Sequence, residues 1–170
     1  MNPFSNNIIF FDTEFTHLDI TKGELLSIGL VKQTGEELYI ELEYDGLEIH
    51  PWVVKKVLPF LTGNKISREE AKKKLYRFFS GYKSKPYLMA YVNQFDAVYW
   101  YKLFGDPKDH PAFWIPIDFA SILFVSGRDP EEMRKDRFFK ELGIDKTKYN
   151  SHNALDDARL LRDVYHKFIT

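Results

Sequence analysis

Three short segments near the start of the chain have the hydrophobic pattern of β-strands. Residues 8–15 open with four apolar side chains, residues 25–31 are mostly apolar, and residues 37–43 alternate polar and apolar side chains with a period of two. Thr34 and Gly35 form a turn between the last two segments. Because such short connections join antiparallel neighbours, the pattern predicts an antiparallel meander of three strands.

After residue 43 the spacing of apolar residues lengthens to the period of helices. Ser67 and Glu70 have the spacing of a capping box, which marks the start of one helix. Because a strand, a helix and a strand in succession imply parallel pairing, we expect an α/β fold with a mixed five-stranded sheet. In this sheet a parallel β-α-β part extends the meander, and helices cover both faces. Helices are predicted over residues 51–61, from Ser67 onward, and over residues 94–104, 129–142 and 152–168, with strands over residues 87–92 and within residues 114–124.

The composition is that of one folded domain over residues 1–170. Of the 170 residues, 44% are apolar and 29% are charged, and no repeat or long linker divides the chain. No apolar run approaches the roughly 18 residues that span a bilayer, and the amino-terminal residues lack the basic start of a signal peptide, so we expect a cytoplasmic protein. The absence of cysteine excludes disulfides, zinc fingers, iron–sulfur ligation and a thiol nucleophile.

Charge is distributed unevenly along the chain, although the net charge is only −1. Residues 1–50 carry 10 acidic and 2 basic residues, residues 51–110 carry 5 and 12, and residues 111–170 carry 10 of each. A protein that binds nucleic acid along an extended track usually has a basic domain, so the total charge disfavours that mode of binding. An acidic segment beside a basic one remains compatible with a metal-assisted site for phosphodiesters.

Asp12 and Glu14 form the first candidate site. They lie two residues apart in a predicted strand, so both side chains point to the same face of the sheet. The alternative is that the strand runs out into solvent and the Asp-Thr-Glu sequence caps a turn. The apolar Phe15 that follows weakens this alternative.

The last predicted helix carries an acidic residue, Asp157, on its apolar face. Its neighbour Asp156 lies on the opposite side and is predicted to face solvent. Because an ionised carboxylate on a buried face is costly, Asp157 needs a partner. The alternative is an acid placed in the first turn by the helix dipole, which explains its position in the sequence but not its side of the helix. At about 100° per residue, the arc that contains Asp157 also holds Ala154, Ala158, Leu161, Val164, Tyr165 and Phe168.

Asp96 and His152 add two further candidates. Asp96 shares a face of its predicted helix with Trp100 and Leu103, which turns this carboxylate inward unless it serves only as an early-turn acid or cap. His152 lies five residues before Asp157, on the loop that enters the last helix, with Ser151 as a candidate cap. A single histidine is more often an ordinary surface or core residue than a catalytic one.

Together these residues make a set of hard oxygen ligands with one histidine and no thiolate. Such a set suits two divalent ions, Mg²⁺ or Mn²⁺, better than zinc. Two ions about 3.5–4 Å apart can bind the attacking water and the leaving 3′ oxygen of a phosphodiester. Histidine can then accept the proton of the water, because its ordinary pKa of about 6.5 is close to neutral pH.

The acidic segments resemble the motifs of the DEDDh (DnaQ-like) 3′-to-5′ exonuclease superfamily, which has a ribonuclease H-like fold. FFDTEF resembles the first motif, which implies Asp12 and Glu14 as metal ligands. VNQFDAVYWYKLF resembles the second motif and implies Asp96 as a further ligand.

HNALDDA resembles the third motif of the same superfamily. The match implies His152 as the general base and Asp157, rather than Asp156, as the last metal ligand. The resemblance extends over residues 8–168 and therefore implies the ribonuclease H-like α/β fold for almost the whole chain.

Within the superfamily the chain is most similar to the short stand-alone bacterial exoribonucleases, with which it shares DTEF, ELLSIGLV, WVVKKVLPFL and YWYKLFG. This similarity implies RNA as the substrate. Phe15, Thr16 and His17 stand where proofreading subunits and ribonuclease T commonly have Thr-Thr-Gly. By their positions, Phe15 and Leu18 are expected to pack on the terminal base and sugar. The backbone near Thr13 and Thr16 is expected to contact the 3′ end.

The sequence thus predicts a two-metal-ion 3′-to-5′ exonuclease that releases nucleoside 5′-monophosphates from single-stranded 3′ ends, with RNA preferred over DNA. One alternative is a DNA-trimming or proofreading exonuclease, because a contact to the ribose 2′-OH can come from the backbone or from many side chains. The other is a non-catalytic nucleic-acid-binding module on the same fold, although such a module would not need buried anions. The resemblance also makes a homodimer plausible.

Overall fold

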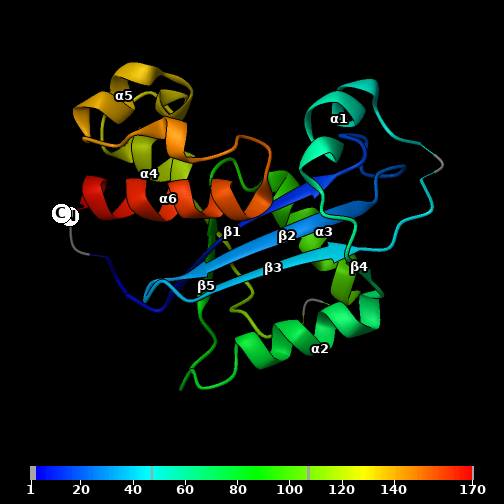
Figure 1. Ribbon diagram of the computed structural model, residues 1–170. Helices are drawn as coiled ribbons and strands as arrows, with labels where there is room; N and C mark the ends of the chain where they lie inside the picture. The colour runs from blue at the N-terminus through cyan, green and yellow to red at the C-terminus, as the bar shows by residue number, and fades with distance from the viewer. Residues whose placement is uncertain (1–2, 47, 107, 170) are drawn as a thin grey trace.

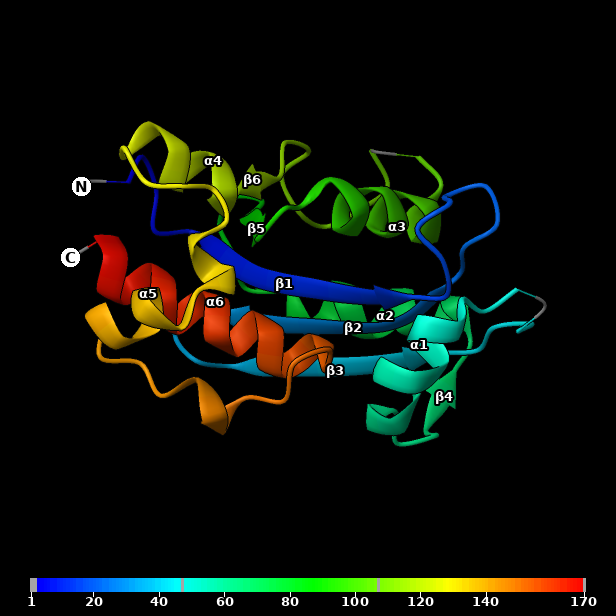
Figure 2. The ribbon, with the colours of Figure 1, turned by 90° about the horizontal axis from the view of Figure 1, so that it is seen from above.

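A six-stranded mixed sheet lies at the centre of the computed structural model, which describes residues 3–46, 48–106 and 108–169. The order across the sheet is β4-β3-β2-β1-β5-β6 (Figures 1 and 2). The first three strands form the predicted antiparallel meander, and β5 and β6 continue the sheet in parallel beside β1. The predicted α/β fold is therefore confirmed. The strands are β1 (Ile8–Phe15), β2 (Leu25–Lys32), β3 (Glu37–Leu42), β4 (Lys65–Ile66), β5 (Tyr87–Ala90) and β6 (Ile117–Asp118).

The described sheet has one strand more than the five predicted. β4 pairs in parallel with the end of β3, where Glu41 is the partner of Lys65 and Leu42 is the partner of Ile66. Two residues are too few to produce an alternating pattern, so no periodic signal marks this strand in the sequence.

Short helices surround the sheet. The predicted start of α2 is confirmed, because Ser67 is its N-cap and the Ser67 side chain accepts a hydrogen bond from Glu70 N (3.2 Å). The helices are α1 (Pro51–Lys56), α2 (Arg68–Phe78), α3 (Gln94–Phe104), α4 (Phe119–Val125), α5 (Asp136–Glu141) and α6 (Ala154–Ile169), with 3₁₀ turns at Leu58–Phe60, Glu132–Arg134 and Lys146–Lys148.

Two predicted helices are shorter than expected. The helix predicted over residues 51–61 ends at Lys56 and is followed by a 3₁₀ turn, where Pro59 has no N–H to continue the α-helical hydrogen bonds. The helix predicted over residues 129–142 is divided by Lys135, whose backbone is extended, so that only its second part is α-helical.

The segment 114–124 contains the predicted strand but is mostly helical. Its strand, β6, ends at Asp118. The Asp118 side chain accepts hydrogen bonds from two N–H groups in the first turn of α4, which starts the helix directly after the strand. An apolar run of this length does not distinguish a buried strand from a buried helix.

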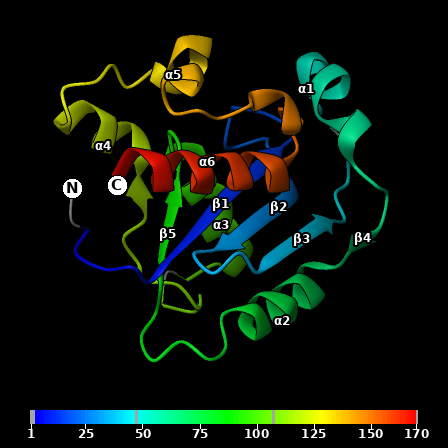
Figure 3. The same cartoon turned by 60° about the vertical axis from the view of Figure 1, so that its left-hand side comes forward.

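Alternating side chains of β1 divide the described interior into layers. Ile9 and Phe11 belong to the core formed with α2 and α3, whereas Ile8 and Phe10 belong to the core formed with α4, α5 and α6. Two views show α2 and α6 on opposite sides of the sheet (Figures 1 and 3). Among the described residues, the helices are too short or too polar to cross a membrane.

β1 extends beyond the end of β5, and this offset makes room for functional side chains. The last register pair between the two strands joins Phe10 and Met89, so the second half of β1 is paired with β2 alone among the described strands. α3 and α6 lie on opposite sides of β1 when the molecule is seen from above (Figure 2). The first turns of these two helices therefore approach the same part of β1.

Candidate active site

Asp12 and Glu14 lie in the second half of β1, which is paired with β2 and extends beyond β5. Because they are two residues apart in the strand, both side chains point to the same face, as predicted, and this is the face of Ile8 and Phe10 that α6 covers. Glu14 is only 9% exposed. Two acidic side chains therefore lie next to each other in a largely buried part of the sheet.

Asp96 reaches the same strand from the first turn of α3. Its side chain is 5% exposed, so the inward orientation predicted for it is confirmed. Asp96 Oδ1 accepts hydrogen bonds from Thr13 N (2.8 Å) and from Thr13 Oγ1 (2.7 Å). Thr13 N lies beyond the end of β5, so the carboxylate occupies the place that a neighbouring strand would otherwise take.

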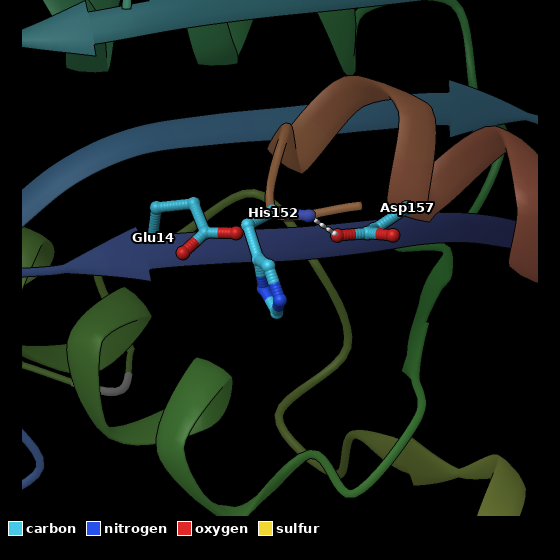
Figure 4. Close-up of side chains that lie close together, drawn as sticks. All are labelled: Glu14, His152 and Asp157. Carbon is cyan, nitrogen blue, oxygen red and sulfur yellow. Dashed lines mark hydrogen bonds between the residues drawn. The ribbon is translucent and has the colours of Figure 1, made fainter. Parts of the chain in front are cut away.

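Asp157 and His152 come from the amino-terminal end of α6. His152 N donates a hydrogen bond to Asp157 Oδ2 (2.8 Å), and Glu14 faces the pair across a short gap (Figure 4). One possible ligand atom from each of Glu14, His152 and Asp157 lies within 4.8 Å of the other two. The three predicted motifs are thus brought together in space.

The loop before α6 has a conformation that its sequence did not reveal. His152 has a positive φ of 69°, a region in which histidine is enriched among residues other than glycine. The cap is Asn153 rather than the predicted Ser151, because Asn153 Oδ1 accepts hydrogen bonds from the N–H groups of Leu155 and Asp156. His152 lies outside the helix, as expected.

Asp156 does not face solvent, and that prediction was wrong. It is 8% exposed, and its Oδ2 accepts hydrogen bonds from Asn150 N (3.0 Å) and Asn150 Nδ2 (2.8 Å). Arg159 forms an ion pair with its other oxygen (2.7 Å). The preceding loop folds back over this side of the helix, which a helical projection cannot show. Asp156 is therefore a buried structural acid, separate from the group that includes Asp157.

The four converging carboxyl groups have raised pKa values. Burial is the largest cause in each case, and it raises the pKa of Glu14 to about 8 and that of Asp157 to about 7. Burial and the charges of the other three groups raise the pKa of Asp12 well above its usual range. Burial raises the pKa of Asp96 to about 6, although its hydrogen bonds from Thr13 act in the opposite direction.

This donor set fits divalent cations. Among the described residues, no lysine or arginine forms an ion pair with any of the four carboxylates. Ionised carboxylates that are buried together require positive charge, and oxygen donors with a single imidazole match the preference of Mg²⁺ and Mn²⁺. The donor set of the site therefore suits a metal-assisted reaction.

His152 has surroundings that keep its imidazole neutral. Burial, together with the positive charge of Lys56, lowers the pKa of His152 below its ordinary value. Its ring lies edge-on to Trp52 of α1, with the ring centroids 4.7 Å apart. Trp52 and Lys56 belong to the WVVKKVLPFL segment, whose resemblance to the exoribonucleases indicated no role for either residue, so neither was singled out as a site residue.

The residues expected to contact substrate have different environments. Leu18 is 64% exposed, whereas Phe15 stacks on Tyr99 with ring centroids 4.3 Å apart. Thr13 and Thr16 are buried, and their backbone N–H groups already donate to the Asp96 carboxylate and to the Glu24 carbonyl. Thr13 is thus bound to a predicted metal ligand, which the motif spacing alone does not indicate.

Gly29 is a further residue near the site that the sequence motifs did not single out. It lies in β2 directly opposite Asp12, and a Cβ at this position would lie 2.2 Å from Ala154 O and 2.3 Å from Leu155 N. Only glycine allows the start of α6 to come this close to the sheet. A glycine inside a predicted strand was the available signal, since such a residue often marks a close approach of another backbone.

Comparison with known protein families gave a match over most of the chain. The family described as "RNase_T: Exonuclease" matches residues 9–165. Among curated protein sequences no match was found.

Several solved structures share the fold. Exonuclease I of E. coli in complex with a dT13 oligonucleotide is 14% identical with a TM-score of 0.68, and the match covers 95% of this chain and 40% of that one. The zinc-bound complex of E. coli exonuclease I with single-stranded DNA is 14% identical with a TM-score of 0.64, and the match covers 94% of this chain and 39% of that one. This chain therefore spans about two fifths of the length of exonuclease I.

A third similar structure is the nuclease domain of 3′hExo, a DEDDh family member, bound to rAMP. It is 12% identical with a TM-score of 0.66, and the match covers 95% of this chain and 90% of that domain. At these identities the similarity demonstrates a shared fold, which is the ribonuclease H-like fold that the motifs implied.

Proposed function

The chain belongs to the RNase_T exonuclease family of the DEDDh superfamily, and on this basis we propose that it removes nucleotides from single-stranded 3′ ends, with RNA preferred over DNA. The observation that supports the proposal most directly is the convergence of four largely buried carboxyl groups and one neutral histidine. In this proposal the metal ligands are Asp12, Glu14, Asp96 and Asp157, and the general base is His152.

The proposed reaction is hydrolysis of the last phosphodiester bond. Two divalent ions, Mg²⁺ or Mn²⁺, supply the positive charge that activates water and stabilises the leaving 3′ oxygen. His152 accepts the proton of the attacking water, because its lowered pKa keeps the imidazole unprotonated at neutral pH. As the water oxygen bonds to phosphorus, the bond to the 3′ oxygen of the preceding nucleotide breaks. The product is a nucleoside 5′-monophosphate.

Substrate contacts are proposed at the end of β1. Leu18 is exposed and Phe15 is partly exposed, so both can offer apolar surface to the terminal base and sugar. We also propose that the backbone near Thr13 and Thr16 contacts the 3′ end, although the N–H groups of these two residues already donate within the protein. Replacing Leu18 by Ala is expected to raise KM for short substrates while metal binding is retained.

RNA is preferred in this proposal because the DTEF, ELLSIGLV and YWYKLFG segments resemble those of short bacterial exoribonucleases. The similar structures point in both directions, since exonuclease I was solved with single-stranded DNA and 3′hExo with rAMP. DNA trimming is therefore the second candidate function. We further propose that the protein is cytoplasmic and forms a homodimer. Its molar mass, measured by light scattering, tests the dimer.

The first experiment measures cleavage of 5′-labelled single-stranded RNA and DNA of the same sequence. Each is incubated with Mg²⁺, with Mn²⁺ or with a chelator, using the unsubstituted protein, Asp157→Asn and His152→Asn. Asparagine is chosen at position 152 because it tolerates the positive φ of this residue. We expect a metal-dependent ladder that shortens from the 3′ end, faster on RNA, and a loss of about 10²–10⁴-fold in rate for His152→Asn.

Each outcome identifies a different part of the proposal. A faster ladder on DNA would overturn the RNA preference and retain the chemistry. Binding of either strand without cleavage in any metal would favour the non-catalytic module. Chromatography of the product must give nucleoside 5′-monophosphates, and release of 3′-monophosphates would contradict the proposed bond cleavage.

A further inference from the structure

Asp118 connects the turn after β5 with the first turn of α4. Its Oδ2 accepts hydrogen bonds from Ser121 N (2.9 Å) and Ser121 Oγ (2.7 Å), which caps α4. Its Oδ1 accepts hydrogen bonds from Ala120 N (3.3 Å) in the first turn of α4, and from Val92 N (2.9 Å) and Asn93 N (3.4 Å), which belong to the turn between β5 and α3. One carboxylate therefore holds two separate segments.

The turn that Asp118 holds has an unfavourable backbone conformation. Val92 has a φ of 58°, which is a steric outlier for a β-branched residue. In the described chain, Val92 and His152 are the residues other than glycine with a positive φ. Each precedes a helix that supplies a carboxylate to the site. Such conformations persist only where the surrounding structure enforces them.

The position of this turn determines where Asp96 lies. Asn93 is the N-cap residue of α3, and its side chain makes no capping hydrogen bond. Asp96 follows three residues later, in the first turn, and reaches Thr13 of β1. The described hydrogen bonds to the N–H groups of Val92 and Asn93 come from Asp118, so this side chain fixes the entry into the helix.

We propose that Asp118 is a positioning residue for the carboxylate site: it holds the Val92–Asn93 turn so that Asp96 is placed beside Asp12. This inference rests on the proposed function, because it concerns the same site. A simple helix cap would need only the bonds to the first turn of α4. The bonds from Oδ1 to the other segment have no part in capping α4, and they connect Asp118 with the start of α3.

The discriminating variant is Asp118→Ser. Serine is a good N-cap residue, so it can retain the cap of α4, but its shorter side chain cannot also hold the Val92–Asn93 turn. Affinity for Mn²⁺ is measured by calorimetry with the nucleic acid absent. We expect Mn²⁺ to bind about tenfold more weakly, which is the range found when residues that orient metal ligands are replaced. The kcat should fall, while KM for an oligonucleotide stays unchanged.

Three further variants separate positioning from stability. Asp118→Asn keeps an oxygen for Val92 N and is expected to retain the Mn²⁺ affinity of the unsubstituted protein. Val92→Gly in the Asp118→Ser background is expected to recover part of the lost Mn²⁺ affinity, because glycine adopts a positive φ without strain. Ser67→Ala removes the comparable cap of α2, so it should lower Tm and leave Mn²⁺ binding unchanged.

The outcomes are distinguishable. If Asp118→Ser binds Mn²⁺ as tightly as the unsubstituted protein and keeps its kcat, the positioning role is wrong and the proposed function stands. If Asp118→Ser and Asp118→Asn lose affinity equally, the bond to Val92 N is not the cause and the inference is also overturned. If the unsubstituted protein neither binds Mn²⁺ nor cleaves nucleic acid, the proposed function itself fails.

Discussion

The four carboxylates differ in how the surrounding backbone compensates their charge. Asp96 accepts two hydrogen bonds from Thr13 of β1, and Asp157 accepts one from His152 N in the loop before α6. Asp12 and Glu14 lie inside a strand, where the N–H groups belong to the sheet. Among the described residues, no donor contacts either side chain. Under the proposed function, these two residues therefore depend most on bound cations.

Thr13→Val tests the compensation at a single residue. Valine keeps the shape of threonine but removes the hydroxyl that donates to Asp96 Oδ1. At pH 8, where Asp96 is ionised, we expect a loss of about 1.5–3 kcal/mol in the free energy of unfolding, the range for a hydrogen bond to a charged group. Urea unfolding of Thr13→Val and of the unsubstituted protein measures this loss. Thr13→Ser keeps a hydroxyl and is the control; equal stability of Thr13→Val and the unsubstituted protein would contradict the role of this bond.

At the scale of elements, the site depends on where the first turns of α3 and α6 meet β1. The short length of β5 leaves one edge of β1 open for α3. Gly29 lets α6 approach the sheet next to Asp12. Each of the two helices carries one proposed metal ligand, so a small displacement of either helix changes the distances between the charges.

Gly29→Ala is predicted to displace the start of α6. The new Cβ would collide with the backbone at Ala154, which cannot move without the whole first turn. We expect a stability loss of about 1–3 kcal/mol from overpacking, together with a loss of Mg²⁺ affinity and of kcat. Val31→Ala, two residues along the same strand, is the matched control because it also destabilises the core but leaves this turn in place. Similar Mg²⁺ affinity in both variants would refute the prediction.

At the scale of the whole molecule, protons stabilise the metal-free fold and compete with metal ions for the same four carboxylates. The four groups have pKa values above those of an unfolded chain, so the metal-free native state binds more protons between about pH 4.5 and pH 8 than the unfolded state does. Proton binding by the four carboxyl groups stabilises the native state fully at a pH below their ordinary pKa values. This stabilisation is lost as the pH rises through their raised pKa values in the native state.

Thermal unfolding at several pH values tests whether the stability falls as the pH rises. Without metal, we expect Tm to fall as the pH rises from about 5 to about 8. Mg²⁺ at 100 times its Kd should stabilise the protein by about 2.7 kcal/mol at pH 8, and less at pH 5.5, where protons compete for the carboxylates. Asp12→Asn should raise Tm of the metal-free protein and reduce the gain from Mg²⁺. A gain from Mg²⁺ that is independent of pH would rule out this competition.

Much of the fold and site could be predicted because it depends on local patterns. The two-residue period of a strand over residues 8–15 placed Asp12 and Glu14 on one face, and the motif spacing singled out Asp96, His152 and Asp157. The sequence did not reveal β4, the burial of Asp156 or the cap at Asn153. β4 has only two residues and pairs with the distant β3, and the loop over residues 150–153 adopts a conformation that no periodic pattern marks.

The sequence by itself therefore determined the identity of the charged groups and the elements that carry them, since periodicity and spacing are local properties. Only the tertiary structure decided how close these groups lie and what holds them there. Thr13 contacts Asp96, Gly29 admits the start of α6, and Asp118 holds the Val92 turn. Each of these contacts joins residues from different elements, and their geometry follows from how the strands end and how the helices pack.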